Sequence, residues 1–397
     1  MRVPRTAWVA VLLVLAALAL LRASGDPLPR LGNGLARTPP MGWNDYNAYG
    51  LDVTEDLIRA TADRMVATGL RDAGYVYVTI DDAWMAPARD SRGDLRADPV
   101  RFPHGIAALA DYVHARGLKL GIYEDAGVRT CGGLPGSLGH ERQDAAAFAA
   151  WGVDYVKYDN CYAGPGCGQT SCEGGDEASA RERYAAMRDA LAATGRPIVF
   201  SLCSWGADRV WAWGAGYGNL WRTTPDIAPT FASLLAVFHA TVGLSGYAGP
   251  GGWNDPDMLE VGNGMSATED RAELSLWAAM AAPLIAGADL TAAAPQTLAD
   301  LANRDVIAVD QDPLGRPARL VSSSGGLDVL TRPLAGGDTA VVLFNETGAA
   351  ATIGWDPGPG RYTVRDLWTG TTSGSTGRIG ATVPAHGAVM FRVVRRV

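Results

Sequence analysis

Apolar and polar positions recur along residues 54–202 in one repeated order: an amphipathic helix, a glycine, a short apolar strand and a polar strand end. In the first unit, Thr54 can cap a helix that ends at Gly69, and the apolar strand over 75–80 then ends in two aspartates. Strands that alternate with helices in this way indicate βαβ units and a parallel sheet.

The same order recurs three more times, with helices that end at Gly117, Gly152 and Gly195 and strands over 118–122, 153–158 and 197–202. Weaker signals predict strands near 220 and over 283–286, and helices over 229–242 and 267–281. About eight such units over roughly 280 residues favour a (β/α)8 TIM barrel over a doubly wound sheet. Neither a G-x-G-x-x-G nor a G-x-x-x-x-G-K-[ST] motif opens a helix, which disfavours nucleotide binding.

The pattern changes at Asp312-Pro313-Leu314-Gly315, where the helical periodicity stops. Short runs of alternating residues follow, such as 327–331 and 340–345, separated by turns rich in Gly and Pro. They predict an antiparallel β domain of about 80 residues. We therefore place the (β/α)8 catalytic barrel in residues 26–314 and a C-terminal antiparallel β-sandwich domain in residues 315–397.

The N-terminal residues 1–25 have the pattern of a signal peptide. Arg2 and Arg5 precede an uncharged apolar run over 6–21, and Ala23-Ser24-Gly25 offers small residues for cleavage. The run is shorter than the ~20 residues that span a membrane, although a retained anchor is the alternative. We expect an exported, secreted protein with no membrane segment beyond this one.

Composition adds exclusions rather than a function. The formal net charge is −8, and no long basic run is present, so we expect no nucleic-acid partner. Neither the five cysteines nor the five histidines have the spacing of a zinc site, and we predict no structural metal. Export makes disulfides possible: Cys131 and Cys161 each follow a predicted strand end, and Cys167 and Cys172 lie close together.

Carboxylates and aromatic residues gather where the predicted strands end. The strand ends of such a barrel converge on one face, which is where catalytic groups come from. The carboxylates are Asp81, Asp82, Glu124, Asp125, Asp159 and Asp226, and the aromatic residues include Trp43, Tyr46, Trp84, Tyr123, Trp205, Trp221 and Trp253. Such a combination suits a sugar, and glycoside cleavage requires two carboxyl groups in different protonation states.

Three of the acidic positions leave alternatives open on the local pattern alone. Lys157 and Asp159 point the same way from one strand, which is consistent with an ionised nucleophile beside a lysine or with a structural ion pair. Asp226 follows Pro225 and has the pattern of a helix N-cap. Asp255-Pro256-Asp257 is typical of a turn. A calcium loop would need alternating ligands and a distal Glu, which are absent.

Seven sequence blocks, in order over about residues 33–315, resemble glycoside hydrolase family 27, the family of α-galactosidases and α-N-acetylgalactosaminidases. The blocks are Arg37-Thr38-Pro39-Pro40-Met41-Gly42-Trp43-Asn44, Ile80-Asp81-Asp82-Ala83-Trp84, Arg101-Phe102-Pro103-His104-Gly105, Leu118-Lys119-Leu120-Gly121-Ile122-Tyr123, Lys157-Tyr158-Asp159, residues 248–259 and residues 305–315. The C-terminal part resembles the β domain of that family.

The resemblance implies a retaining double displacement that uses no cofactor. It identifies Asp159 with the nucleophile and Asp226 with the general acid/base, which replaces the N-cap interpretation. Such a pair should lie about 5–5.5 Å apart. It also implies that Asp81 and Asp82 hold the O4 and O6 hydroxyls of the sugar and that Cys131 pairs with Cys161. The other implied sugar contacts are Tyr46, Tyr123, Lys157 and Arg222.

The loop after residue 202 bears on specificity. Many α-galactosidases of the family have Glu where Ser204 stands, whereas the N-acetylgalactosaminidases have Ser there and Ala three residues on, as Ser204 and Ala207 do. The loop continues over 208–214 in a way that resembles microbial and plant α-galactosidases. The aspartate pair at 81 and 82 favours a sugar with an O6 hydroxyl.

We therefore expect an exo-acting enzyme that removes terminal α-D-galactosyl residues from galacto-oligosaccharides or polysaccharides. The alternatives within the same family are an α-N-acetylgalactosaminidase and a β-L-arabinopyranosidase. An alternative of another class is a non-catalytic carbohydrate-binding protein, although such a protein has no need of both Asp159 and Asp226.

Overall fold

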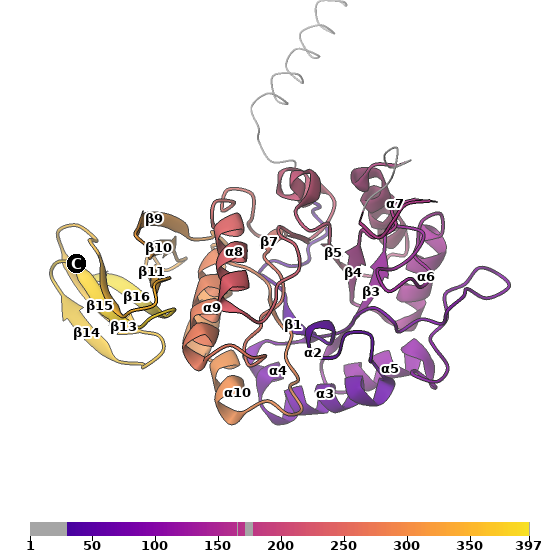
Figure 1. Cartoon of the computed structure of the whole chain (residues 1–397), viewed down its shortest axis with the longest axis horizontal. Coiled ribbons are helices and arrows are strands. Elements are labelled where there is room, and N and C mark those ends of the chain that lie inside the picture. Colours follow the sequence, from indigo (N-terminus) through magenta and orange to yellow (C-terminus); the bar gives the residue numbers. More distant parts are fainter. Residues whose placement is uncertain (1–29, 165, 171–177, 397) are drawn as a thin grey trace, which may run out of the picture.

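The computed structural model describes residues 30–164, 166–170 and 178–396, so the predicted signal peptide over 1–25 lies outside the described residues. Eight parallel strands form one sheet in the order β7-β6-β5-β4-β3-β2-β1-β8 (Figure 1). Their bounds are β1 Met41–Asn44, β2 Tyr77–Ile80, β3 Lys119–Asp125, β4 Tyr155–Asp159, β5 Val199–Leu202, β6 Leu220–Arg222, β7 Trp253–Asp255 and β8 Leu284–Ala286. Leu259, just after β7, bridges Ala286 in parallel, so the sheet closes into the predicted barrel.

Helices surround this barrel and follow its strands in the predicted alternation (Figure 1). They are α2 Tyr46–Tyr49, α3 Glu55–Ala67, α4 Leu70–Ala73, α5 Gly105–His114, α6 Glu141–Trp151, α7 Ala180–Ala193, α8 Phe231–Val242, α9 Ala267–Met280, α10 Pro295–Leu301 and α11 Arg304–Asp310, with 3-10 turns η1 Ala207–Ala212 and η2 Gly214–Gly216. Thr54 caps α3 as predicted, since its side chain accepts from Leu57 N. No helix within the described ranges is long and apolar enough to cross a membrane.

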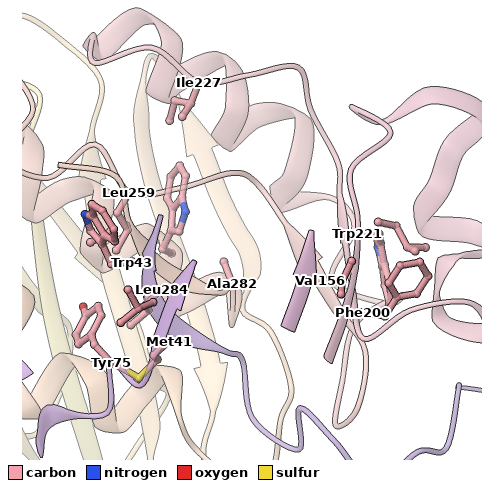
Figure 2. Packing of buried hydrophobic residues seen from close by; sticks show 14 of the residues in the cluster. Met41, Trp43, Tyr75, Val156, Phe200, Trp221, Ile227, Leu259, Ala282 and Leu284 are labelled. Atoms are coloured by element: carbon pink, nitrogen blue, oxygen red, sulfur yellow. The ribbon is translucent and has the colours of Figure 1, made fainter. Parts of the chain in front are cut away.

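The barrel core is built from large side chains of the strands and their flanking helices. Figure 2 shows Trp43, Tyr75, Phe200 and Trp221 among aliphatic residues of the same cluster, and all four are almost fully buried. The barrel strands show little alternation of apolar and polar residues, because parallel strands of a barrel are covered on both faces.

The C-terminal part folds as a separate antiparallel β structure beside α8 and α9 (Figure 1). A six-stranded sheet has the order β14-β13-β16-β11-β10-β9, and β12 pairs with β15 in a second, two-stranded sheet. The bounds are β9 Arg319–Ser324, β10 Leu327–Pro333, β11 Thr339–Asn345, β12 Ala351–Trp355, β13 Arg361–Asp366, β14 Thr372–Ser375, β15 Ile379–Val383 and β16 Ala388–Arg396. The predicted boundary after residue 314 falls between α11 and β9.

The central strand β11 of the six-stranded sheet is apolar on both faces, because each face packs against a different partner. Val341 and Leu343 of β11 pack in the cluster shared with β12 and β15, whereas Val342 and Phe344 belong to the core shared with the barrel. Arg332 of β10 is buried in this contact and donates to the backbone carbonyl oxygens of Ala278 and Asp310. The β domain is thus fixed to the outside of the barrel, against α9.

Candidate active site

A cavity of about 340 Å³ lies at the carboxyl ends of the barrel strands. Every predicted catalytic and sugar-binding residue except Ser204 lines it: Tyr46, Asp81, Asp82, Tyr123, Lys157, Asp159, Arg222 and Asp226. These side chains come from the ends of β1, β2, β3, β4 and β6 and the loops after them. The parallel barrel therefore brings together residues up to 180 positions apart in the sequence.

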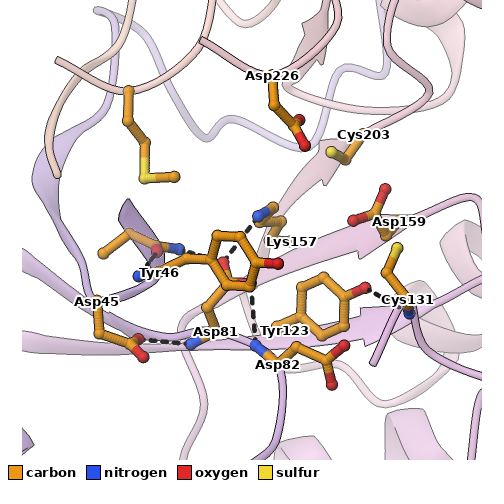
Figure 3. Close-up of polar contacts among 12 residues, drawn as sticks. Asp45, Tyr46, Asp81, Asp82, Tyr123, Cys131, Lys157, Asp159, Cys203 and Asp226 are labelled. Carbon is orange, nitrogen blue, oxygen red and sulfur yellow. Dashed lines mark hydrogen bonds and ion pairs between the residues drawn. The ribbon is translucent and has the colours of Figure 1, made fainter. Parts of the chain in front are cut away.

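Asp81 is the hub of the hydrogen bonds that Figure 3 shows along one wall of the cavity. Its Oδ2 accepts from Lys157 Nζ at 2.7 Å and from Asn44 Nδ2 at 2.6 Å. Its backbone N–H donates to Asp45 Oδ1 at 2.7 Å. The ion pair of Lys157 is therefore with Asp81, two strands away in the barrel. Although burial acts against the charge, Asp81 and the other nearby anions hold the pKa of Lys157 well above its ordinary value.

Asp82 is fixed by backbone donors on both sides. Its Oδ1 accepts from Ala83 N and its Oδ2 from Gly132 N, each at 2.7 Å. Burial raises the pKa of Asp82, and these two N–H groups oppose the rise. The carboxyl group is thus held in one orientation, as a residue that must accept hydrogen bonds from a sugar in a defined geometry should be.

The predicted disulfide between Cys131 and Cys161 is present and joins the loop after β3 to the residues just after β4. Gly132, which donates to Asp82, lies next to Cys131 in the first loop. The backbone N–H of Cys131 donates to the Tyr123 hydroxyl at 3.4 Å (Figure 3). The bridge therefore ties together two loops that shape the cavity wall on the side of Asp159.

Asp159 lies at the end of β4 with only 6% of its surface exposed. Burial raises the pKa of this carboxyl to about 6, against the lowering effect of the Lys157 ammonium, and the Asp226 carboxylate adds to the rise. Figure 3 shows Asp159 and Asp226 reaching toward the same space, with the Cys203 side chain between them. A deeply placed carboxylate facing a second carboxyl group is the pairing that glycoside hydrolysis requires.

Asp226 stands at the mouth of the cavity, where 71% of its side chain is exposed. Although partial burial acts to raise it, the pKa of Asp226 lies below its ordinary value because of Arg222, which forms an ion pair with Asp226 Oδ1 at 2.9 Å, and Lys157. The next helix, α8, begins at Phe231 and has Thr230 as its N-cap. The N-cap interpretation of Asp226 from the local pattern is therefore wrong.

Ser204 does not face the cavity. It is fully buried, and its hydroxyl has no hydrogen-bond partner among the described residues. Its neighbour Trp205 lines the cavity instead, with a left-handed backbone φ of 53° that is rare for so large a residue. A contact between Ser204 and the sugar thus remains a prediction from the resemblance, and Trp205 is the residue of this loop that can touch a ligand.

Several lining residues were absent from the predicted site. They are Asn47, Gln169, Thr170, Pro225, Asp257 and Met258. Gln169 and Thr170 lie in a glycine-rich loop with no periodicity to place them. Asp257 and Met258 belong to one of the seven sequence blocks, residues 248–259, and that block could have placed them in the site. The local pattern alone indicated only a turn.

A (β/α)8 barrel whose strand ends present paired carboxylates in an aromatic-walled pocket is the architecture of a glycoside hydrolase. Comparison with known families supports this class. Residues 38–312 match the family model "Alpha galactosidase A", and residues 324–393 match "Alpha galactosidase C-terminal beta sandwich domain". The chain therefore belongs to the melibiase family of α-galactosidases, glycoside hydrolase family 27.

Individual relatives agree with this placement. The chain is 48% identical to Alpha-galactosidase 3 of Arabidopsis thaliana over 91% of this chain and 83% of that protein. It is 42% identical to Alpha-galactosidase A of Cellvibrio japonicus, over 97% and 98% of the two chains. Among solved structures, an α-galactosidase from Saccharomyces cerevisiae with raffinose superposes with a TM-score of 0.83 at 31% identity, over 93% of this chain and 100% of that one.

Proposed function

We propose that the protein hydrolyses terminal α-D-galactosyl groups of galacto-oligosaccharides or polysaccharides with retention of configuration. The observation that carries the proposal is the placement of Asp159 and Asp226 in one cavity, the first deep and the second at its mouth. The raffinose bound by the yeast relative is a galactoside of this class.

The cavity offers a hydroxyl-rich sugar both acceptors and donors. Asp81 and Asp82 are acceptors fixed by their own hydrogen bonds, and the Lys157 ammonium is a donor held by Asp81. Tyr46 is 37% exposed beside Lys157, so its ring can cover the C–H face of the sugar. These contacts orient the sugar so that its anomeric carbon faces Asp159.

The reaction follows as two displacements at that carbon. In the first, an Asp159 carboxylate oxygen attacks C1, the bond from C1 to the leaving oxygen breaks, and Asp226 donates its proton to that oxygen. In the second, Asp226 takes a proton from water, the water oxygen bonds to C1, and the bond to Asp159 breaks. Each step inverts C1, so the product keeps the α configuration, and the residues of this chain suffice for every proton transfer.

The Cys131–Cys161 disulfide supports a second part of the proposal, that the protein works outside the reducing cytosol. The signal-peptide pattern of residues 1–25 also predicts export. In a reducing compartment, the disulfide that shapes the active-site wall would be lost.

Substrate preference is the test of the proposed activity. We expect initial rates on nitrophenyl α-galactopyranoside to exceed those on the α-N-acetylgalactosaminide and the β-L-arabinopyranoside by about tenfold or more, since the first alternative has a larger group in place of the 2-hydroxyl and the second lacks the O6 hydroxyl. A lead for the N-acetyl sugar would assign the protein the first alternative activity, and a lead for the arabinoside the second. Rates indistinguishable from buffer on all three would favour the non-catalytic sugar-binding protein.

A further inference from the structure

One guanidinium serves two carboxylates at the wall of the cavity. Arg222 Nη2 forms ion pairs with Asp257 Oδ2 at 2.7 Å and with Asp226 Oδ1 at 2.9 Å. The two carboxylates differ in environment, because the Asp257 side chain is 4% exposed and the Asp226 side chain 71%. Arg222 itself is 4% exposed, so water does little to screen its charge.

Asp257 is held in place by more than Arg222. Its Oδ2 accepts from Ile227 N at 2.8 Å, next to Asp226 in the chain, and its Oδ1 accepts from Met258 N at 2.7 Å. Its backbone N–H donates to Asp255 Oδ1 at 3.0 Å. The backbone φ of Asp257 is 102°, a conformation that an aspartate adopts only when the surroundings enforce it. The fold thus maintains a strained residue in order to place this carboxylate.

The proposed reaction gives this arrangement a purpose. Asp226 must carry a proton when the glycosidic bond breaks, but an unshared arginine at 2.9 Å would keep it ionised. A second, buried carboxylate on the same Nη2 offsets part of the arginine charge that acts on Asp226. We propose that Asp257 is a positioning residue that acts through Arg222 to let Asp226 hold the proton it donates to the leaving group.

Other charged groups face the same space and set the background of the effect. Those that interact electrostatically with Arg222, Asp226 or Asp257 are Lys157, Asp159, Cys203, Asp255, Glu260 and Glu273, and the ring of Tyr46 also senses Asp226. Arg222 and Lys157 are the two cations of this set, and Lys157 is already paired with Asp81. When the charge of Asp257 is removed, Asp226 is therefore the carboxylate that remains paired with Arg222.

The test is the substitution Asp257→Asn, which keeps the side-chain shape and tolerates the backbone conformation. We expect the alkaline limb of the pH profile of kcat/KM, which reports loss of the Asp226 proton, to move down by about one pH unit, because an uncompensated arginine lowers the pKa of Asp226. The maximal kcat/KM on raffinose should fall about tenfold, whereas on dinitrophenyl α-galactoside, whose leaving group needs little protonation, it should fall much less. Asp257→Gly, which suits the same φ, serves as a second variant if the asparagine variant does not fold.

The inference rests on the proposed role of Asp226, and the design separates the two. If Asp226→Ala shows no dependence on the leaving group, the proposed acid/base role fails. If Asp226→Ala shows that dependence but Asp257→Asn lowers kcat/KM equally on both substrates, or leaves the alkaline limb in place, Asp257 is merely structural and the inference is overturned. In an Asp226→Ala background, Asp257→Asn should have less than about a twofold further effect on raffinose, against about tenfold when Asp226 is present, because the two residues act as one unit.

Discussion

The substitution Asp159→Ala will lower kcat on nitrophenyl α-galactoside by on the order of 10⁵-fold, since the first displacement loses its nucleophile. The folded state should persist, because the carboxyl group is buried at a cost that raises its pKa to about 6. Initial rates on the purified variant, with a thermal melt to confirm folding, measure the effect. Residual activity within about tenfold of the unsubstituted protein would remove Asp159 from the reaction.

Azide provides the sharper form of this experiment. A small anion can occupy the space left by the Asp159 carboxylate and attack C1 from the same side. The rescued product should then be the β-galactosyl azide, formed by a single inversion. Formation of the α-azide, or no rescue together with normal binding of galactose, would contradict the assignment of Asp159.

The substitution Asp226→Ala should have an effect that depends on the leaving group. We expect kcat/KM on raffinose to fall by about 10²–10⁴-fold, the usual contribution of a general acid, and on dinitrophenyl α-galactoside to fall far less. On the second substrate the galactosyl-enzyme should accumulate, because no base activates water. Azide should release it as the α-galactosyl azide, the opposite anomer to that from Asp159→Ala.

A matched control is available in the same face of the barrel. Asp208 is an exposed aspartate of η1, in the loop after β5, and it does not line the cavity. Asp208→Ala should leave both substrates within about twofold of the unsubstituted rates, as surface substitutions usually do. If it reproduced the leaving-group dependence of Asp226→Ala, a general electrostatic effect of the loop carboxylates would explain both results, and the acid/base role of Asp226 would be wrong.

The periodicity of the sequence predicted most of the barrel because its helices carry both an apolar face and an end signal. Thr54 caps α3 and Gly152 ends α6, as the pattern indicated. The strands β1 and β7 were not predicted, because Met41–Asn44 and Trp253–Asp255 contain too few apolar residues to form an apolar run. Their strand conformation comes from pairing with their neighbours in the closed sheet, which is a tertiary effect.

The site shows the same division between local and tertiary information. The alternation of β4 correctly put Lys157 and Asp159 on one face, but the ion-pair partner of Lys157 is Asp81, from the end of β2. Sequence spacing cannot show this ion pair, because β2 and β4 are separated by β3 and their ends come together only in the assembled barrel. In the same way, the sequence pattern around Asp257 predicted a turn of the backbone, but it gave no sign of the buried ion pair between Asp257 and Arg222.

The most direct test of the central claim, a double displacement at Asp159 assisted by Asp226, is the anomer that the enzyme releases first. Proton NMR during the first minutes of hydrolysis of nitrophenyl α-galactoside distinguishes the two anomers of galactose before they interconvert. A double displacement releases α-galactose first, and the β anomer then grows in by mutarotation. Initial release of β-galactose would show a single displacement by water, and the nucleophile role assigned to Asp159 would be wrong.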